Sequence, residues 1–225
     1  MARFDPGPLG QVIGKIGNYV VRKMNGKYFI SLRPDSYNAS QSEKSKRSRK
    51  RFGNCVQFAK TISNLPELSA AWRSANITGS SPYHRIIKHN IKLTLDGKLS
   101  ASNIITPEGL SNPFLSIQFN REFLSASLIN NLDRIEFPFT LFKACFIIYM
   151  IASAGTITKS DSFRIISKDV DAEQTHEIKI NFSADDINIF NEYKDFIIFS
   201  AAVWNEGTDK ILWSSTAASE INLSE

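Results

Sequence analysis

The chain has 225 residues, of which 42% are hydrophobic and 22% are charged, values that exclude a disordered chain and allow one large domain or two small ones. Two cysteines exclude a disulfide scaffold, and the longest apolar run, 144–154, is too short to span a bilayer. Residues 1–60 carry a net charge of +10 and residues 61–225 a net charge of −5, so we expect a basic front end that faces a polyanion or an acidic partner.

The first predicted element is a β-hairpin. Residues 18–24 and 27–33 are rich in β-branched and aromatic side chains, and Asn25-Gly26 lies between them. This pair is the strongest short hairpin signal, because a type I′ turn needs positive φ at both central residues. Pro34 then ends the second strand by removing a hydrogen-bond donor. The glycines before the hairpin match no phosphate-binding loop, because a strand follows where a helix would be needed.

Three helices are expected next. The first begins near Ser40, where Ser40 and Glu43 have the spacing of a capping box, and its apolar stripe continues to residue 62. A proline starts the second helix, over 66–75, and the third covers 83–91.

The pattern changes after residue 97 from a period of 3.6 to a period of 2 and to continuous apolar runs. Turn signals separate these runs, among them Lys168-Asp169, the segment 184–186 and the segment 205–208. Short strands between turns, without long helices, are typical of an antiparallel sandwich. The candidate strands are 114–119, 134–139, 143–152, 162–167, 177–182, 196–204 and 210–214.

The predicted fold class is therefore α+β. A β-hairpin and about three helices form a basic module, 1–97, and an immunoglobulin-like antiparallel β-sandwich follows over 98–225. The N-terminus lacks the pattern of a signal peptide. We expect a soluble cytoplasmic protein, or one incorporated in a virion or another assembly.

One succession of motifs comprises Gly14-Lys15-Ile16-Gly17, Val21-Arg22, Gly26-Lys27, Arg33-Pro34, a helix with Arg51 and Phe52, and Pro82-Tyr83 with Asn90. This order resembles a family of uncharacterised proteins from Bacteroidetes and their mobile elements, classed as a domain of unknown function. Ser48 stands where that family has Gln, and His84 where it tends to have Asn. Helices of this kind followed by a Trp, as Trp72 is here, also resemble segments of phage-encoded proteins. The resemblance implies a layout that ends in a β domain, and it implies no reaction.

No pattern of catalytic or metal-binding residues occurs in the sequence. His84 and His89 are five residues apart, which places them about 140° apart around a helix and not on one metal-binding face. Asp185-Asp186 is predicted to be a solvated turn, and Cys145 a core residue. We therefore predict a protein that is not an enzyme, with no catalytic residue, cofactor, metal or small-molecule substrate.

The candidate functional residues are the basic ones of the front end. Three interpretations are open: a solvated helix face, a surface for DNA or RNA with Tyr19, Tyr28 and Phe29 stacking on bases, or an arm that docks on the acidic body of a neighbouring copy. We expect a structural or assembly protein that binds itself or another protein, with nucleic-acid binding as the alternative and no membrane partner. The predicted contact residues are Arg22, Lys23, Lys27, Arg33, Lys44, Lys46, Arg47, Arg49, Lys50 and Arg51.

Overall fold

The computed structural model describes residues 2–4, 13–33, 36, 39–129, 140–152, 160–206 and 210–223. The chain divides into two compact units, Met1–Ser42 and Glu43–Glu225. The predicted strand 134–139, Pro34 and the last residues of the predicted turn at 205–208 lie outside the described residues. No described helix is long and apolar enough to cross a membrane.

The N-terminal unit contains an antiparallel sheet with the strand order β1-β4-β3-β2. The predicted hairpin is confirmed: β3 pairs with β4, and Asn25 and Gly26 between them have φ values of 49° and 76°. The sheet is larger than the predicted hairpin, because two three-residue strands add to its edges. Its strands are β1 (Ala2–Phe4), β2 (Gly14–Ile16), β3 (Tyr19–Met24) and β4 (Lys27–Leu32).

The register gives this sheet two different faces. Directly paired residues of an antiparallel sheet project to the same side. Ile16 pairs with Tyr19, which pairs with Leu32, and these three define the apolar row on one face. The opposite face carries Lys15, Arg22 and Lys27, with Val20, Met24 and Phe29 between them.

Three helices begin the second unit: α1 (Glu43–Ser63), α2 (Pro66–Ser74) and α3 (Pro82–Asn90). The first helix begins three residues later than predicted, at Glu43, so the predicted capping box was also wrong. The Ser40 hydroxyl lies 3.4 Å from the Ser42 amide and 3.2 Å from the Ser42 hydroxyl, so it belongs to the turn before the helix. Glu43 is the first helical residue, and its carboxylate pairs with Lys46 instead of accepting from the backbone at Ser40.

Two antiparallel sheets complete the second unit. The three-stranded sheet comprises β5 (Phe114–Phe119), β6 (Phe123–Leu128) and β9 (Glu177–Asn181). The five-stranded sheet comprises β7 (Leu141–Ile151), β8 (Ser162–Asp171), β10 (Asp195–Glu206), β11 (Lys210–Trp213) and β12 (Ala217–Asn222). Its order is β8-β7-β10, with β11 and β12 pairing successive parts of β10. A short helix, α4 (Ala184–Phe190), connects the two sheets between β9 and β10.

Two predicted turns were wrong, and the described part of a third belongs to a strand. Lys168-Asp169 lies inside β8, because these residues pair with β7 instead of ending the strand. In the predicted turn 205–208, residues 205–206 still belong to β10, where they pair with β11. Residues 184–186 begin α4, because the Ser183 hydroxyl accepts from the Asp186 amide and the Asp186 carboxylate bonds Ser183 in return.

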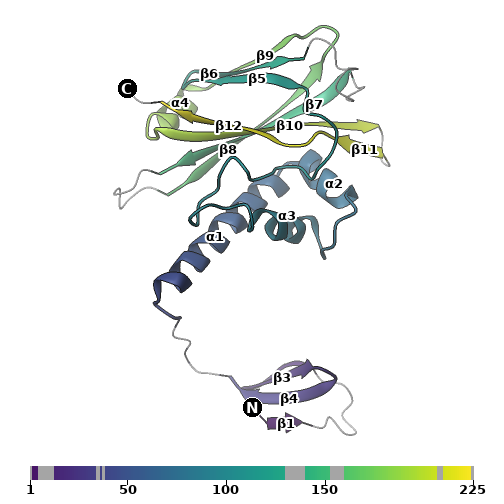
Figure 1. Ribbon diagram of the computed structural model, residues 1–225, viewed down its shortest axis with the longest axis vertical. Helices are drawn as coiled ribbons and strands as arrows, with labels where there is room; N and C mark the ends of the chain where they lie inside the picture. Colours follow the sequence, from purple (N-terminus) through teal and green to yellow (C-terminus); the bar gives the residue numbers. More distant parts are fainter. Residues whose placement is uncertain are drawn as a thin grey trace. The chain divides into compact units, whose positions relative to one another are not determined.

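The five-stranded sheet is buried on both faces. Along β7, Phe146 and Ile148 contribute to a core shared with the three-stranded sheet, whereas Ile147 and Tyr149 contribute to a core shared with α1–α3. The helices and the second sheet thus cover opposite faces, as Figure 1 shows. Because helices and strands share one core, the division falls between Ser42 and Glu43 instead of the predicted 97 and 98.

The connection from α3 to β5 is fixed by buried polar groups. The Asn90 side chain, fully buried, donates to the Ile104 carbonyl (2.9 Å) and accepts from the Ile104 amide (2.8 Å) and from Asn103 (3.0 Å). Further along, the Thr216 hydroxyl accepts from the amides of Ile105 and Thr106 at 2.9 and 3.0 Å. Buried polar groups need such partners, so this segment is bound to both the helices and the sheet.

Candidate functional site

The basic residues predicted on the hairpin do not share one face. Arg22 and Lys27 project on the side that also carries Phe29, whereas Lys23 lies on the opposite side, with its ammonium 5.3 Å from the centre of the Tyr28 ring. Arg33 follows β4, and its backbone N–H donates to the Asn18 carbonyl (2.7 Å).

The three aromatic residues proposed as stacking groups are also divided. Tyr19 and Tyr28 share the face with Lys23, and only Phe29 lies beside Arg22, its cross-strand partner. The basic face therefore offers one aromatic ring among its cations, fewer than the sequence suggested.

The six predicted basic residues of α1 are all exposed and surround the helix. At about 100° per residue, Arg47 and Arg51 lie on the same side as buried Cys55, whereas Lys46 and Lys50 lie on the opposite side. They occupy the first half of α1, which Figure 1 shows extending away from the rest of its unit. Lys44 and Lys46 lie in the first turn of α1, where cations oppose the helix dipole. An anion bound at this turn would be stabilised by the dipole and by these two cations.

Few acidic groups neutralise this segment. Lys46 pairs with Glu43 at 3.0 Å, and Arg47 lies 4.0 Å from Asp96, both between exposed groups. Within the described part of the chain, three of the six make no ion pair: Lys44, Lys50 and Arg51. The first half of α1 is thus a basic surface of which the protein itself satisfies only part.

The apolar row is a feature of the N-terminal unit that the sequence did not reveal. Ile16, Tyr19 and Leu32 are 49%, 48% and 65% exposed, although apolar residues in a paired row usually face a core. Among the described residues of this unit, Val21 is the one hydrophobic side chain that is fully buried. The β-prone composition of β3 and β4 was visible in the sequence, but the pairing of β2 was not predicted.

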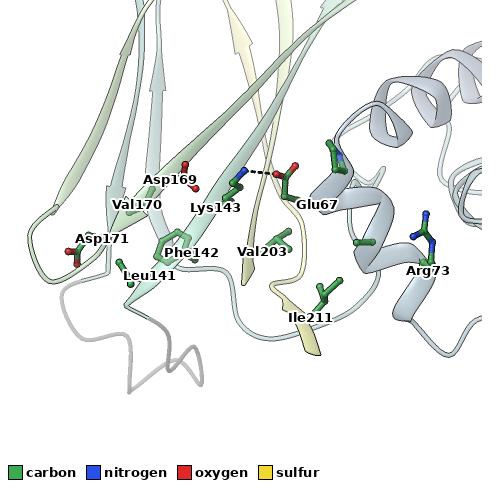
Figure 2. Close-up of a pocket in the computed structure, with 12 residues that line it drawn as sticks. Glu67, Arg73, Leu141, Phe142, Lys143, Asp169, Val170, Asp171, Val203 and Ile211 are labelled. Carbon is green, nitrogen blue, oxygen red and sulfur yellow. Dashed lines mark hydrogen bonds and ion pairs between the residues drawn. The ribbon is translucent and has the colours of Figure 1, made fainter. Parts of the chain in front are cut away.

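A hollow of about 790 Å³ lies at one end of the five-stranded sheet, beside α2. It occurs on the face that the helices cover, where β7 and β8 extend past α2, as Figure 2 shows. Leu141 is 62% exposed there, although it lies next to buried Phe142. The residues that line the hollow include Glu67, Leu141, Lys143, Asp169, Asp171 and Ile211. None of these residues was predicted from the sequence to belong to a functional site.

An ion pair joins α2 to the sheet inside the hollow. Lys143 Nζ lies 2.7 Å from Glu67 Oε1. Burial favours the neutral form of Glu67, but the hydrogen bond from Lys143, a backbone hydrogen bond and the charge of Lys143 outweigh it and lower the Glu67 pKa. The same hydrogen bond and charge raise the pKa of Lys143. Glu67 Oε2 is buried and has no hydrogen-bond partner among the described residues.

Other reactive side chains have structural partners. Asp186 is buried, caps α4 and pairs with Arg164 at 3.0 Å, so the predicted solvated turn was wrong for this residue. His84 Nδ1 lies 2.7 Å from the Ser81 hydroxyl, which also accepts from the His84 amide and so caps α3. Across the described ranges, no group of three or more His, Cys, Asp or Glu could hold a metal ion.

Both cysteines are free and buried. Burial raises the pKa of Cys55 to about 11 and that of Cys145 to about 12, so neither is a reactive thiolate at neutral pH. Cys145 is a core residue, as predicted.

Comparison with known proteins found no matching family model, no matching curated protein and no matching solved structure.

Proposed function

We propose that this chain is a non-enzymatic structural or assembly protein, whose basic N-terminal unit docks on an acidic surface of another copy. The observation that carries this proposal is the exposed apolar row of Ile16, Tyr19 and Leu32 on a small sheet. A hydrophobic side chain of this size contributes about 1.5–3 kcal/mol when it is moved from water into a core. A partner that covers the row would therefore gain binding free energy from surface that is now in contact with water.

Charge supports a second copy as the partner. Residues 1–60 carry +10 and residues 61–225 carry −5, so the front of one molecule attracts the remainder of another. A contact between two unlike surfaces is head-to-tail, and it generates rings or filaments. The resemblance to mobile-element and phage-encoded proteins is consistent with such an assembly.

We also propose that the two sheets of the second unit form an immunoglobulin-like sandwich. The pairing order supports this: β5-β6-β9 corresponds to strands A-B-E of that fold, and β7, β10 and β11 correspond to C, F and G. β8 would then be an additional strand beside C. An experimental structure tests the assignment, since aligned sheets should cross at about −30°, and an angle near 90° would contradict it.

Light scattering coupled to size-exclusion chromatography tests the assembly function. The parent chain should self-associate at low salt and less at high salt, because charge guides the contact. The double substitution Tyr19→Asp with Leu32→Asp should give a monomer. Leu115→Asp is the matched control, since Leu115 is 71% exposed on β5 outside the proposed contact. A double variant that associates like the parent would refute the proposal.

Nucleic-acid binding remains a second candidate because Lys44, Lys50 and Arg51 are exposed in the first half of α1 and make no ion pair in the described part of the chain. Changing all three to Ser should weaken DNA or RNA binding and reduce the log–log salt slope by about 0.7–0.9 for each phosphate that the variant no longer neutralises. The control changes an equal number of exposed lysines, Lys60, Lys92 and Lys194. Equal losses of affinity in both triple variants would indicate a nonspecific charge effect and refute a site on the first half of α1, since Lys60 lies in its last turn.

A further inference from the structure

We infer that the hollow beside α2 is the docking site for the apolar row of a second copy. This inference rests on the proposed assembly function and names both of its surfaces. The hollow is open because α2 does not cover the end of the sheet, where Leu141 pairs with Asp171 and Lys143 with Asp169. An apolar floor beneath charged groups is the usual composition of a site that takes an amphipathic partner.

The apolar row and the hollow both expose hydrophobic side chains that could cover each other. Leu141 and Ile211 line the hollow, and Leu141 is 62% exposed, close to the 65% of Leu32 in the apolar row. Strands lie about 4.8 Å apart, so a row across three strands is about 10 Å wide. A hollow of about 790 Å³ has room for several side chains of this row.

The polar groups correspond as well. Lys23 is exposed and lies on the same face of the sheet as the apolar row. Asp169 and Asp171 line the hollow, and within the described ranges neither makes an ion pair. Asp169 already interacts with Lys143 of its own chain, so Lys23 of the second copy would meet Asp171, which makes no ion pair in the described part of the chain.

Glu67 gives a further reason to expect a hydrogen-bond donor in the hollow. Its Oε2 atom is buried without a partner among the described residues, which is energetically unfavourable. A phenol donates one hydrogen bond, so the hydroxyl of Tyr19, in the middle of the row, is a donor of the kind that this oxygen lacks.

Cysteine cross-linking between two differently tagged full-length chains tests the contact. One chain carries Leu32→Cys and the other Leu141→Cys, both at exposed positions where little folding free energy is at stake. The native Cys55 and Cys145 are fully buried and should not react in the folded protein. A short bifunctional maleimide should give a cross-linked heterodimer from this mixture. The control is a mixture of Leu32→Cys with Leu115→Cys, since Leu115 on β5 is more exposed than Leu141. This mixture should give at least about tenfold less cross-linked heterodimer.

The outcomes separate this inference from the function on which it rests. If Tyr19→Asp with Leu32→Asp abolishes self-association but Leu32→Cys links no better to Leu141→Cys than to Leu115→Cys, the row docks elsewhere and the hollow is not its site. If a chain with both Leu32→Cys and Leu141→Cys links only within itself, the partner is not a second copy. If the double Asp variant still self-associates, the proposed function and this inference both fail. Unchanged thermal melts of the variants verify that each is folded.

Discussion

At the scale of single residues, Arg85 closes the C-terminal end of α2. Its Nη1 donates to the carbonyl oxygens of Trp72, Arg73 and Ala75 at 2.8, 3.0 and 3.1 Å. The last carbonyl groups of a helix have no partner within the helix, and a basic side chain there also interacts favourably with the dipole. Gly79 adjoins this contact, because a Cβ atom at that position would come within 2.6 Å of the Arg85 side chain.

Arg85→Ala should lower the free energy of unfolding by about 1.5–3 kcal/mol, since its hydrogen bonds are made by a charged donor. Arg85→Lys should recover only part of the loss, because an ammonium group lacks the planar fork of the guanidinium. Urea unfolding measures both changes, and Lys92→Ala is the exposed control. Equal stability of the three variants would show that the cap contributes nothing.

The Glu67–Lys143 pair should make stability depend on pH. Glu67 has a lowered pKa in the folded chain, so its stabilisation is present above the ordinary value of 4.5 and is lost as the pH falls through the folded value. The raised pKa of Lys143 means that its contribution is lost only as the pH rises through that value, above 10.5. Without Lys143, only the backbone hydrogen bond opposes burial, which favours the protonated form of Glu67.

The difference in unfolding free energy between the parent and Lys143→Met should therefore be largest near neutral pH and shrink as the pH falls below 4.5. Urea titrations at a series of pH values measure this difference. Lys194→Met, at an exposed site, should show a difference that hardly changes over the same range. A constant difference for Lys143→Met would mean that the pair is not coupled to folding.

At the scale of elements, the segment between α3 and β5 has no regular structure, yet it is firmly held. Trp72 of α2, fully buried, donates from its indole nitrogen to the Ile105 carbonyl (2.8 Å). Asn90 binds the segment from the helix side, and Thr216 binds it from the start of β12. The segment therefore connects the helices to the edge of the five-stranded sheet.

Thr216→Val removes the hydroxyl but keeps the shape of the side chain, so the amides of Ile105 and Thr106 lose their acceptor. We expect the free energy of unfolding to fall by about 1–3 kcal/mol. Thr216→Ser keeps the hydroxyl and should lose less than Thr216→Val, measured by the same denaturant titration. A larger loss for the Ser variant would point to packing of the methyl group instead.

Element types were predictable where a local signal determined them. Asn25-Gly26 defined the hairpin and Pro66 the start of α2, because turn geometry and a missing N–H act within a few residues. β6 escaped prediction because Ser125, Ala126 and Ser127 have little intrinsic preference for strands, and the first two become buried only through pairing. α4 escaped because the residues that cap a helix are also those of turns.

At the scale of the whole molecule, the domain boundary and the candidate site could not be predicted from the sequence. The apolar run of β7 shows that both faces are covered, but it does not tell which layer covers each face. The basic residues were evident, whereas the apolar row and the hollow depend on the pairing of distant strands. The row requires β2 to pair beside β3, and the hollow requires α2 to stop short of the end of the sheet that carries Leu141.

A fragment that spans residues 43–225 should keep a cooperative melt close to that of the parent, since it is a separate compact unit. A fragment that spans 98–225 should not, because it would expose the sheet face where Ile147, Tyr149 and Phe199 contact the helices. Circular dichroism melts and dye binding to exposed apolar surface compare the two. Cooperative folding of the shorter fragment would mean that the helices are dispensable for the core.

The doubly covered sheet also has a consequence during synthesis. Helices α1–α3 leave the ribosome first, yet β10, which contributes Phe199 to their core, ends at residue 206. At translation rates of about 5–20 residues per second, the apolar stripes of these helices wait on the order of ten seconds for that strand. During this interval the nascent chain presents a surface suited to chaperones, and slower translation between α3 and β10 should prolong that exposure.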